Sequence, residues 1–228
     1  MSFYDEVSAQ YNAWSANVTG DFEFYVELAR DCDGPLIELA VGTGRVAIPV
    51  AQATGRRVIG IDSSEGMLEQ ARQNATVAEV DLDLRLSDMQ DFEADEPCGL
   101  IYCPGRSLLH IPTWKERRRV FEQVARSLQP GGRFAWNVFA LDHQIAAQLD
   151  GKHQTSPAPH VNHYNVAENR VDMILDDGAT SSLWWATKNE WLGLIDVAGL
   201  EVEALHGDFD GSELSADSRE YIFVTRRP

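Results

Sequence analysis

The chain has 228 residues, 44% of them hydrophobic, which is enough for one large domain with a buried core. Its 36 acidic residues outnumber its 19 basic ones, and the net charge of −17 argues against nucleic acid or an anionic membrane surface as a partner. We expect neither a signal peptide nor a membrane span, because the basic and long apolar segments that define them are missing. Three cysteines without a CxxC pair are typical of reduced thiols, so we expect a cytoplasmic location.

Predicted helices and strands alternate through the first 140 residues. Apolar residues at spacings of three and four predict an amphipathic helix within residues 21–32. Predicted strands follow at residues 35–40, 57–62, 82–86, 99–103 and 133–139. Helices are predicted from residues 45 to 53, after Ser63 or Ser64, and from Thr113 to about residue 128, where Pro130-Gly131-Gly132 ends the last of them. Five alternations of strand and helix predict a doubly wound, mainly parallel α/β sheet.

The pattern changes from about residue 155. Short β-rich pieces surround turn signals between residues 160 and 185, which indicates an antiparallel insertion. A helix is predicted near residues 189–198, ending at Gly199, and strands at 201–205 and 221–225 then form an antiparallel closing hairpin. Together with the five earlier strands, this hairpin predicts a seven-stranded sheet.

The stretch ELAVGTGRV, residues 38–46, contains a glycine-rich turn that binds a nucleotide in many α/β proteins. Residues 42–47 satisfy the G-x-G-x-x-G/A pattern, in which glycine lets a ligand approach the backbone closely. Asp62 lies twenty residues after Gly42, at the end of the second strand, where a carboxylate accepts hydrogen bonds from a ribose diol. Proteins that bind NAD and proteins that bind S-adenosylmethionine share both devices, so these two features leave both cofactors open.

Three further features favour S-adenosylmethionine. Glu38 lies four residues before Gly42 and places negative potential near the turn, which suits a sulfonium and an ammonium but repels a pyrophosphate. Asp88 and Met89 follow the third strand, where an acid accepts from an adenine amino group while methionine packs on the ring. Finally, more than thirty residues precede the first strand of this chain, whereas many NAD-binding domains begin almost at their first strand.

Four motifs, in order and at the expected spacings, resemble those of class I S-adenosylmethionine-dependent methyltransferases. They are ELAVGTGRVAIPVA (38–51), VIGIDSSEGMLEQAR (58–72), LRLSDMQDF (84–92) and VARSLQPGGRFAWNVF (124–139). The opening FYDEVSAQYNAW resembles a segment that often covers the cofactor in members acting on small molecules. The chain departs from the family at Asn12, where Asp is frequent, and at Ala40-Val41, where Gly-Cys or Gly-Ala is frequent.

This resemblance implies a role for each matching residue. Gly42, Thr43 and Gly44 surround the methionine part of the cofactor, and Asp62 binds the ribose. The remaining implied positions are Ser63 beside Asp62, Met67 near the adenine, Asp88 and Met89 at the adenine, and Tyr11 in the lid. Other interpretations stay open: the two methionines as core packing, Asp88 as a turn or helix cap, and Tyr11 as packing of an N-terminal helix.

The resemblance also implies the organisation of the chain as a single Rossmann-like methyltransferase domain. Its expected parts are an N-terminal helical lid (1–33), a cofactor-binding core (34–140), an antiparallel insertion (about 155–187) and a closing helix with strands (188–228).

The end of the fourth strand is where the family tends to place groups that face the methyl acceptor. His110 is our candidate base, because some relatives acting on small molecules carry a similar S-x-x-H stretch, and Arg106 is a candidate anchor for an acidic substrate. The alternatives are a histidine bonded to backbone and a surface ion pair. His160 and His163 do not predict a metal site, because residues three apart on a strand point to opposite faces.

We therefore expect an enzyme that methylates a nitrogen or oxygen of a small molecule with S-adenosylmethionine, and no metal. Two alternatives remain: a catalytically silent module that binds S-adenosylmethionine or S-adenosylhomocysteine, and an NAD-dependent oxidoreductase. The acceptor's identity and the oligomeric state stay open.

Overall fold

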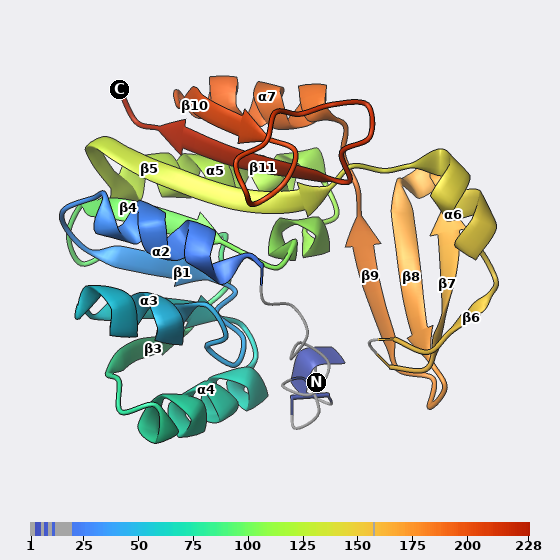
Figure 1. Cartoon of the computed structure of the whole chain (residues 1–228), viewed down its shortest axis with the longest axis horizontal. Coiled ribbons are helices and arrows are strands. Elements are labelled where there is room, and N and C mark those ends of the chain that lie inside the picture. Colours follow the sequence, from blue (N-terminus) through green and yellow to red (C-terminus); the bar gives the residue numbers. More distant parts are fainter. Residues whose placement is uncertain (1–2, 6, 9–10, 12–19, 157) are drawn as a thin grey trace.

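A mixed seven-stranded sheet runs through the computed structural model, which describes residues 3–5, 7–8, 11, 20–156 and 158–228 (Figure 1). The strand order is β10-β11-β5-β4-β1-β2-β3. The strands are β1 (Leu36–Leu39), β2 (Val58–Asp62), β3 (Leu82–Leu86), β4 (Cys98–Cys103), β5 (Leu128–Phe139), β10 (Glu201–His206) and β11 (Glu220–Arg226). Strands β1 to β5 pair in parallel, whereas β11 pairs antiparallel with both β5 and β10. The predicted fold class is confirmed, including the antiparallel C-terminal pair.

Helices cover both faces of this sheet (Figure 1). One face carries α2 (Phe22–Arg30), α3 (Ala47–Thr54) and α4 (Glu65–Val77), and the other carries α5 (Trp114–Ser127) and α7 (Lys188–Val197). Neighbouring residues of β1 point to opposite faces: Leu36 packs on the α2–α3 side and Ile37 on the α5–α7 side. Because both faces are covered, every residue of β1 and β4 is buried, which explains why the two strands carry no charged residue except Glu38.

Helix α5 shows how local sequence sets an element's boundaries. The Thr113 side chain accepts from the Glu116 N–H, and the Glu116 carboxylate accepts from the Thr113 N–H, so the capping box predicted from their spacing is present. The helix ends close to the predicted position, but the segment that follows it differs from the prediction. The helix ends at Ser127 and β5 begins at Leu128, which places Pro130-Gly131-Gly132 inside the strand, where the register with β4 shifts.

A second sheet of four antiparallel strands lies beside the carboxyl ends of the parallel strands (Figure 1). It contains β6 (His153–Gln154), β7 (His160–Asn165), β8 (Arg170–Leu175) and β9 (Thr180–Trp184), with the short helical turn η2 (Val166–Glu168) between β7 and β8. A helix that we did not predict, α6 (His143–Leu149), precedes it and is capped by the Asp142 carboxylate. The buried Arg117 of α5 donates to the Trp184 carbonyl, which attaches this sheet to the core.

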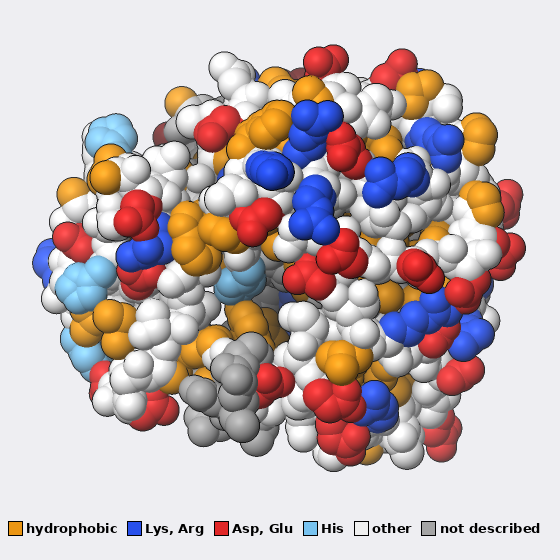
Figure 2. Space-filling model, turned by 180° about the vertical axis from the view of Figure 1, so that it is seen from behind, with side chains coloured by type: hydrophobic (Ala, Val, Ile, Leu, Met, Phe, Trp, Pro, Cys, Tyr) orange, Lys and Arg blue, Asp and Glu red, His pale blue; other side chains and the backbone are white. Residues whose placement is uncertain are grey.

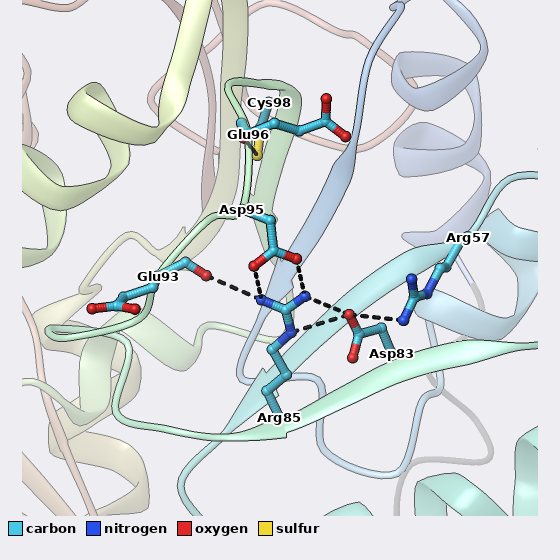
Figure 3. Close-up of polar contacts among 7 residues, drawn as sticks. All are labelled: Arg57, Asp83, Arg85, Glu93, Asp95, Glu96 and Cys98. Carbon is cyan, nitrogen blue, oxygen red and sulfur yellow. Dashed lines mark hydrogen bonds and ion pairs between the residues drawn. The ribbon is translucent and has the colours of Figure 1, made fainter.

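The exposed edge strand β3 is tied to the loop before β4 by charged side chains (Figure 3). Arg85 bonds to Asp83 on its own strand and to Asp95 on the loop, and Arg57 bonds to the same Asp83. Such a charged edge resists pairing with another chain. No helix of the described residues is long and apolar enough to cross a membrane.

Candidate functional site

The glycine-rich turn follows β1 and is held by the carboxylate at the end of β2. The Gly42 N–H donates to Asp62 Oδ2 at 2.8 Å, and the Ser64 N–H donates to Asp62 Oδ1 at 2.9 Å. Gly42 and Gly44 have φ angles of 55° and 82°, which glycine adopts without strain. Backbone N–H groups, including that of Ser63, occupy only part of the acceptor capacity of the two oxygens, so the carboxylate that shapes the turn retains the capacity to bind a ribose hydroxyl.

A cavity of about 170 Å³ lies beyond the carboxyl ends of the first three strands. Five of the predicted site residues line it together: Asp62, Ser63, Asp88, Met89 and His110. Asp88 Oδ1 also accepts from the Gln90 N–H at 2.8 Å, so the turn role that we considered for this residue is present as well. The structure thus gathers residues from the ends of β2, β3 and β4 around one small polar hollow.

Met67 and Tyr11 lie differently from these five. Met67 is 1% exposed and does not line the cavity. The ring of Tyr11 meets that of Tyr4 edge-on, with 6.0 Å between the ring centroids. Burial raises the pKa of Tyr11; the negative charge of Asp62 raises it further, and the positive charge of Arg45 lowers it. Tyr11 is therefore close to the charged groups of the turn. Asn12 is outside the described residues.

Two buried polar atoms beside the turn have no hydrogen-bond partner among the described residues. They are Oε2 of Glu38, inside β1, and Oγ1 of Thr43, in the turn itself. Burial raises the pKa of Glu38 well above its ordinary value, because the lost hydration of the carboxylate outweighs the opposing effects of the Tyr102 hydroxyl and the positive charge of Arg45. A buried acid and hydroxyl without partners fit a ligand that brings hydrogen-bond donors and positive charge, as the ammonium and sulfonium of S-adenosylmethionine do.

His110, at the end of η1 (Ser107–His110), has hydrogen-bond partners at both ring nitrogens. Its Nδ1 lies 3.1 Å from the Ser182 carbonyl, which only accepts, so Nδ1 carries the hydrogen; Nε2 then accepts from the Tyr4 hydroxyl at 2.6 Å. Burial lowers the pKa of His110 to about 4, which keeps the ring neutral at physiological pH. The backbone contact that we considered is present, and it fixes the tautomer.

The N-terminal residues near this site were quoted in our motif comparison but not singled out. The Ser64 hydroxyl donates to Asp5 Oδ1 at 2.5 Å, beside the start of α4. Gly66 permits this approach, because a Cβ there would lie 3.0 Å from the Ser8 hydroxyl and 3.3 Å from Asp5 Cα. The sequence signal for this contact is Tyr4-Asp5 in the opening motif, which our sequence analysis did not connect to the start of α4.

A larger cavity of about 400 Å³ lies between the end of β5, α6 and the small sheet. Its lining combines apolar side chains with a few polar and charged ones: Arg106, Phe139, Ala140, Leu141, Asp142, Ile145, Ala146, Ser156, His160, Asn162, Tyr164, Val171, Met173, Leu183 and Arg219. Of these, we predicted only Arg106 as a site residue. Figure 2 shows a hollow between the core and the small sheet, with hydrophobic side chains and a histidine at its wall.

Arg106 lies on the loop after β4 in the left-handed region, with φ of 62°. Its guanidinium pairs with Glu220, whose side chain is 13% exposed, and the Asn137 amide donates to the same carboxylate. The ion pair that we considered for Arg106 is therefore present, although its partner is largely buried. Arg106 also lines the larger cavity.

Comparisons with known proteins agree with this geometry. Residues 36–132 match the family described as methyltransferase domain. The chain is 26% identical to the cypemycin N-terminal methyltransferase of a Streptomyces species, over 98% of this chain and 94% of that protein. Other curated relatives match over about half of their own length or less.

Two solved structures have the same fold over nearly their whole length. The CcbJ methyltransferase from Streptomyces caelestis matches with a TM-score of 0.83 and 22% identity, covering 100% of this chain and 98% of that one. An S-adenosylmethionine-dependent methyltransferase from Clostridium acetobutylicum matches with a TM-score of 0.82 and 15% identity, covering 98% of each chain.

Proposed function

Because this chain is a class I S-adenosylmethionine-dependent methyltransferase, we propose that it transfers a methyl group to a nitrogen or oxygen atom of a small molecule. The observation that carries this proposal is the 400 Å³ cavity between the carboxyl edge of the core and the small sheet. That volume is in the range of small-molecule sites, and the mixed apolar and polar lining is typical of them. The full-length relative is named as an N-terminal methyltransferase, which supports nitrogen as one acceptor atom.

The small cavity and the adjoining glycine-rich turn are proposed to hold the cofactor. Asp62 accepts from the ribose hydroxyls, Asp88 and Met89 take the adenine, and Gly42 to Gly44 surround the methionine part. Glu38 supplies negative potential beneath the turn, and Tyr11 belongs to the cover. When bound, S-adenosylmethionine supplies a methyl group on a sulfonium, which is already activated for displacement. The protein's main task is then to hold the acceptor in line with that group.

His110 is proposed to take the proton that the acceptor loses. Its Nε2 has a lone pair at physiological pH, because burial keeps the ring neutral, and the Tyr4 hydroxyl already donates to it. A proton from the acceptor therefore reaches His110 through Tyr4: the Tyr4 oxygen accepts it while the phenolic proton moves to Nε2. Hydrogen bonding of Nδ1 to the Ser182 carbonyl supports the imidazolium that forms.

Turnover across a panel of small amines, phenols and carboxylic acids tests the proposal. We expect methylated nitrogen or oxygen products by mass spectrometry, together with binding of S-adenosylhomocysteine in calorimetry. A protein that binds S-adenosylhomocysteine but methylates no member of a broad panel fits a silent binding module instead. The acidic net charge further predicts that DNA and RNA are not methylated.

A further inference from the structure

The inner face of the small sheet is polar on β7 and apolar on the neighbouring β8, at the positions that line the cavity. Residues at every second position of a strand share a face, and on β7 the cavity-lining positions are His160, Asn162 and Tyr164. Opposite them on β8, in register, Asn162 pairs with Met173 and Tyr164 with Val171. The cavity therefore has a hydrogen-bonding edge next to an apolar floor.

His160 is the most buried polar residue of that edge, with 4% of its surface exposed. Its Nδ1 lies 2.7 Å from the Ala158 carbonyl, which only accepts, so Nδ1 carries the hydrogen of the neutral ring. Among the residues that the structure describes, the lone pair of Nε2 is then met only by the Asn162 amide at 3.3 Å, which is long for a hydrogen bond. An O–H donor generally makes a shorter hydrogen bond than an N–H donor, so Nε2 has a better partner when a ligand hydroxyl is present than when Asn162 alone meets it.

We propose that His160 determines acceptor specificity by accepting a hydrogen bond from a hydroxyl of the acceptor, away from the methylated atom, while Met173 and Val171 support the acceptor's apolar body. This rests on the proposed function, and it narrows the substrate class to amphipathic molecules with a hydroxyl along one edge. Analogues that lack the hydroxyl leave the buried Nε2 without a short partner, and they bind more weakly for that reason.

Binding to the cavity is measurable without turnover. The sequence has four methionines; Met173 lines the acceptor cavity and Met89 the smaller one. The protein is labelled with ¹³C-methyl methionine and saturated with S-adenosylhomocysteine. A change in the NMR signal of the Met173 methyl group then shows that an aromatic probe has entered the acceptor cavity. The probes are tyramine and phenethylamine, which differ by one hydroxyl. We expect the unaltered protein to bind tyramine about tenfold more tightly, as for one net hydrogen bond.

Three substitutions separate recognition from folding. His160→Leu should reduce the preference for tyramine to nearly one, whereas His160→Gln, which retains a hydrogen-bonding group, should preserve part of it. The control is His163→Leu on the same strand, since His163 faces outward with 56% of its side chain exposed and should leave the preference unchanged. Affinity for S-adenosylhomocysteine and the melting temperature show whether each variant is folded.

The inference is overturned by equal affinities of the two probes for the unaltered protein, by silence of the Met173 signal with both, or by a full preference in folded His160→Leu. If His160→Leu does not fold, a folded His160→Gln decides instead: a reduced preference for tyramine supports the role, and a full preference rejects it. Failure of the proposed function gives a different result, because it leaves probe binding intact and abolishes methylated products across the whole panel.

Discussion

The carboxyl edge of the core sheet and the inner face of the small sheet enclose neighbouring cavities but are built differently. The first is made by turns: Asp62 holds the glycine-rich turn through backbone N–H groups, and Asp88 holds its own turn. The second is made by regular strands, whose alternation presents His160, Asn162 and Tyr164 on one face. A turn needs particular residues at fixed spacing, whereas a strand accepts many side chains at each position, so the two regions differ in how much a single sequence discloses.

His110 lies at the boundary between the two regions, and replacing it tests whether they act together. We expect His110→Ala to lower kcat by about 10²-fold or more, as for loss of a general base, while affinity for S-adenosylhomocysteine stays nearly unchanged. In the unaltered enzyme the acidic limb of kcat/KM, which reports the free enzyme, should lie near pH 4, following the lowered pKa of His110, and not near the ordinary value of 6.5. Steady-state kinetics across pH measure both. Unaltered kcat in His110→Ala rejects this residue as the base, and Tyr4→Phe should lower kcat similarly.

Replacing Asp62 probes the turn side alone. Asp62→Ala removes the proposed ribose contact and also the acceptor for the Gly42 and Ser64 N–H groups. We expect cofactor affinity to fall by roughly 1–3 kcal/mol, as for a lost hydrogen bond to a charged group, and calorimetry with S-adenosylhomocysteine measures it. The control is Asp91→Ala, which removes an exposed carboxylate from a surface ion pair with Arg119 and should change affinity little. Equal affinities of the two variants contradict the assignment.

Glu38 makes the turn side dependent on pH. Because its pKa is raised in the free protein, Glu38 keeps a proton at pH values where an exposed glutamate has lost it, and a cationic ligand favours the ionised form. Binding of S-adenosylmethionine should therefore release a proton, and affinity should rise with pH until the pKa of the free protein is passed. Glu38→Gln should weaken binding, on the order of tenfold, and flatten this dependence. It should also stabilise the free protein at alkaline pH, since the folded state no longer has to bury an ionised carboxylate. Calorimetry at several pH values measures this dependence. If the affinity of Glu38→Gln still rises with pH as steeply as that of the unaltered protein, the proton released on binding comes from another group.

The smallest expected effect concerns Ala40. This residue has a φ of 55°, in the left-handed region, and class I methyltransferases often have glycine at this position. Ala40→Gly should raise the free energy of unfolding by about 0.5–1 kcal/mol, because glycine relieves the left-handed strain while costing some unfolded-state entropy. Denaturant unfolding measures this. The matched control is Ala53→Gly on the exposed side of helix α3, which should destabilise by about the same amount. Destabilisation by both substitutions shows that Ala40 is not strained.

Periodicity and short motifs predicted most of the core. The five parallel strands and the capping box at Thr113 follow from local patterns, because the two buried faces and the unpaired N–H groups of a helix start each demand particular residues nearby. Helix α6 was missed, since it is only seven residues long and none of them is buried, which leaves no apolar stripe to detect. The start of β5 was placed too late, because pairing with β4 carries the strand through Pro130 and the two glycines.

The candidate site divides along the same line. The sequence by itself determined the glycine-rich turn, the acids at positions 38, 62 and 88, and the family to which they belong, because each is a short segment whose chemistry and spacing are local. Only the tertiary structure decided that His110 meets Tyr4 across 106 residues, that Arg106 pairs with Glu220, and that His160 lies in the same cavity as Arg106. These pairings depend on how two sheets pack together, and no periodicity within either segment encodes that packing.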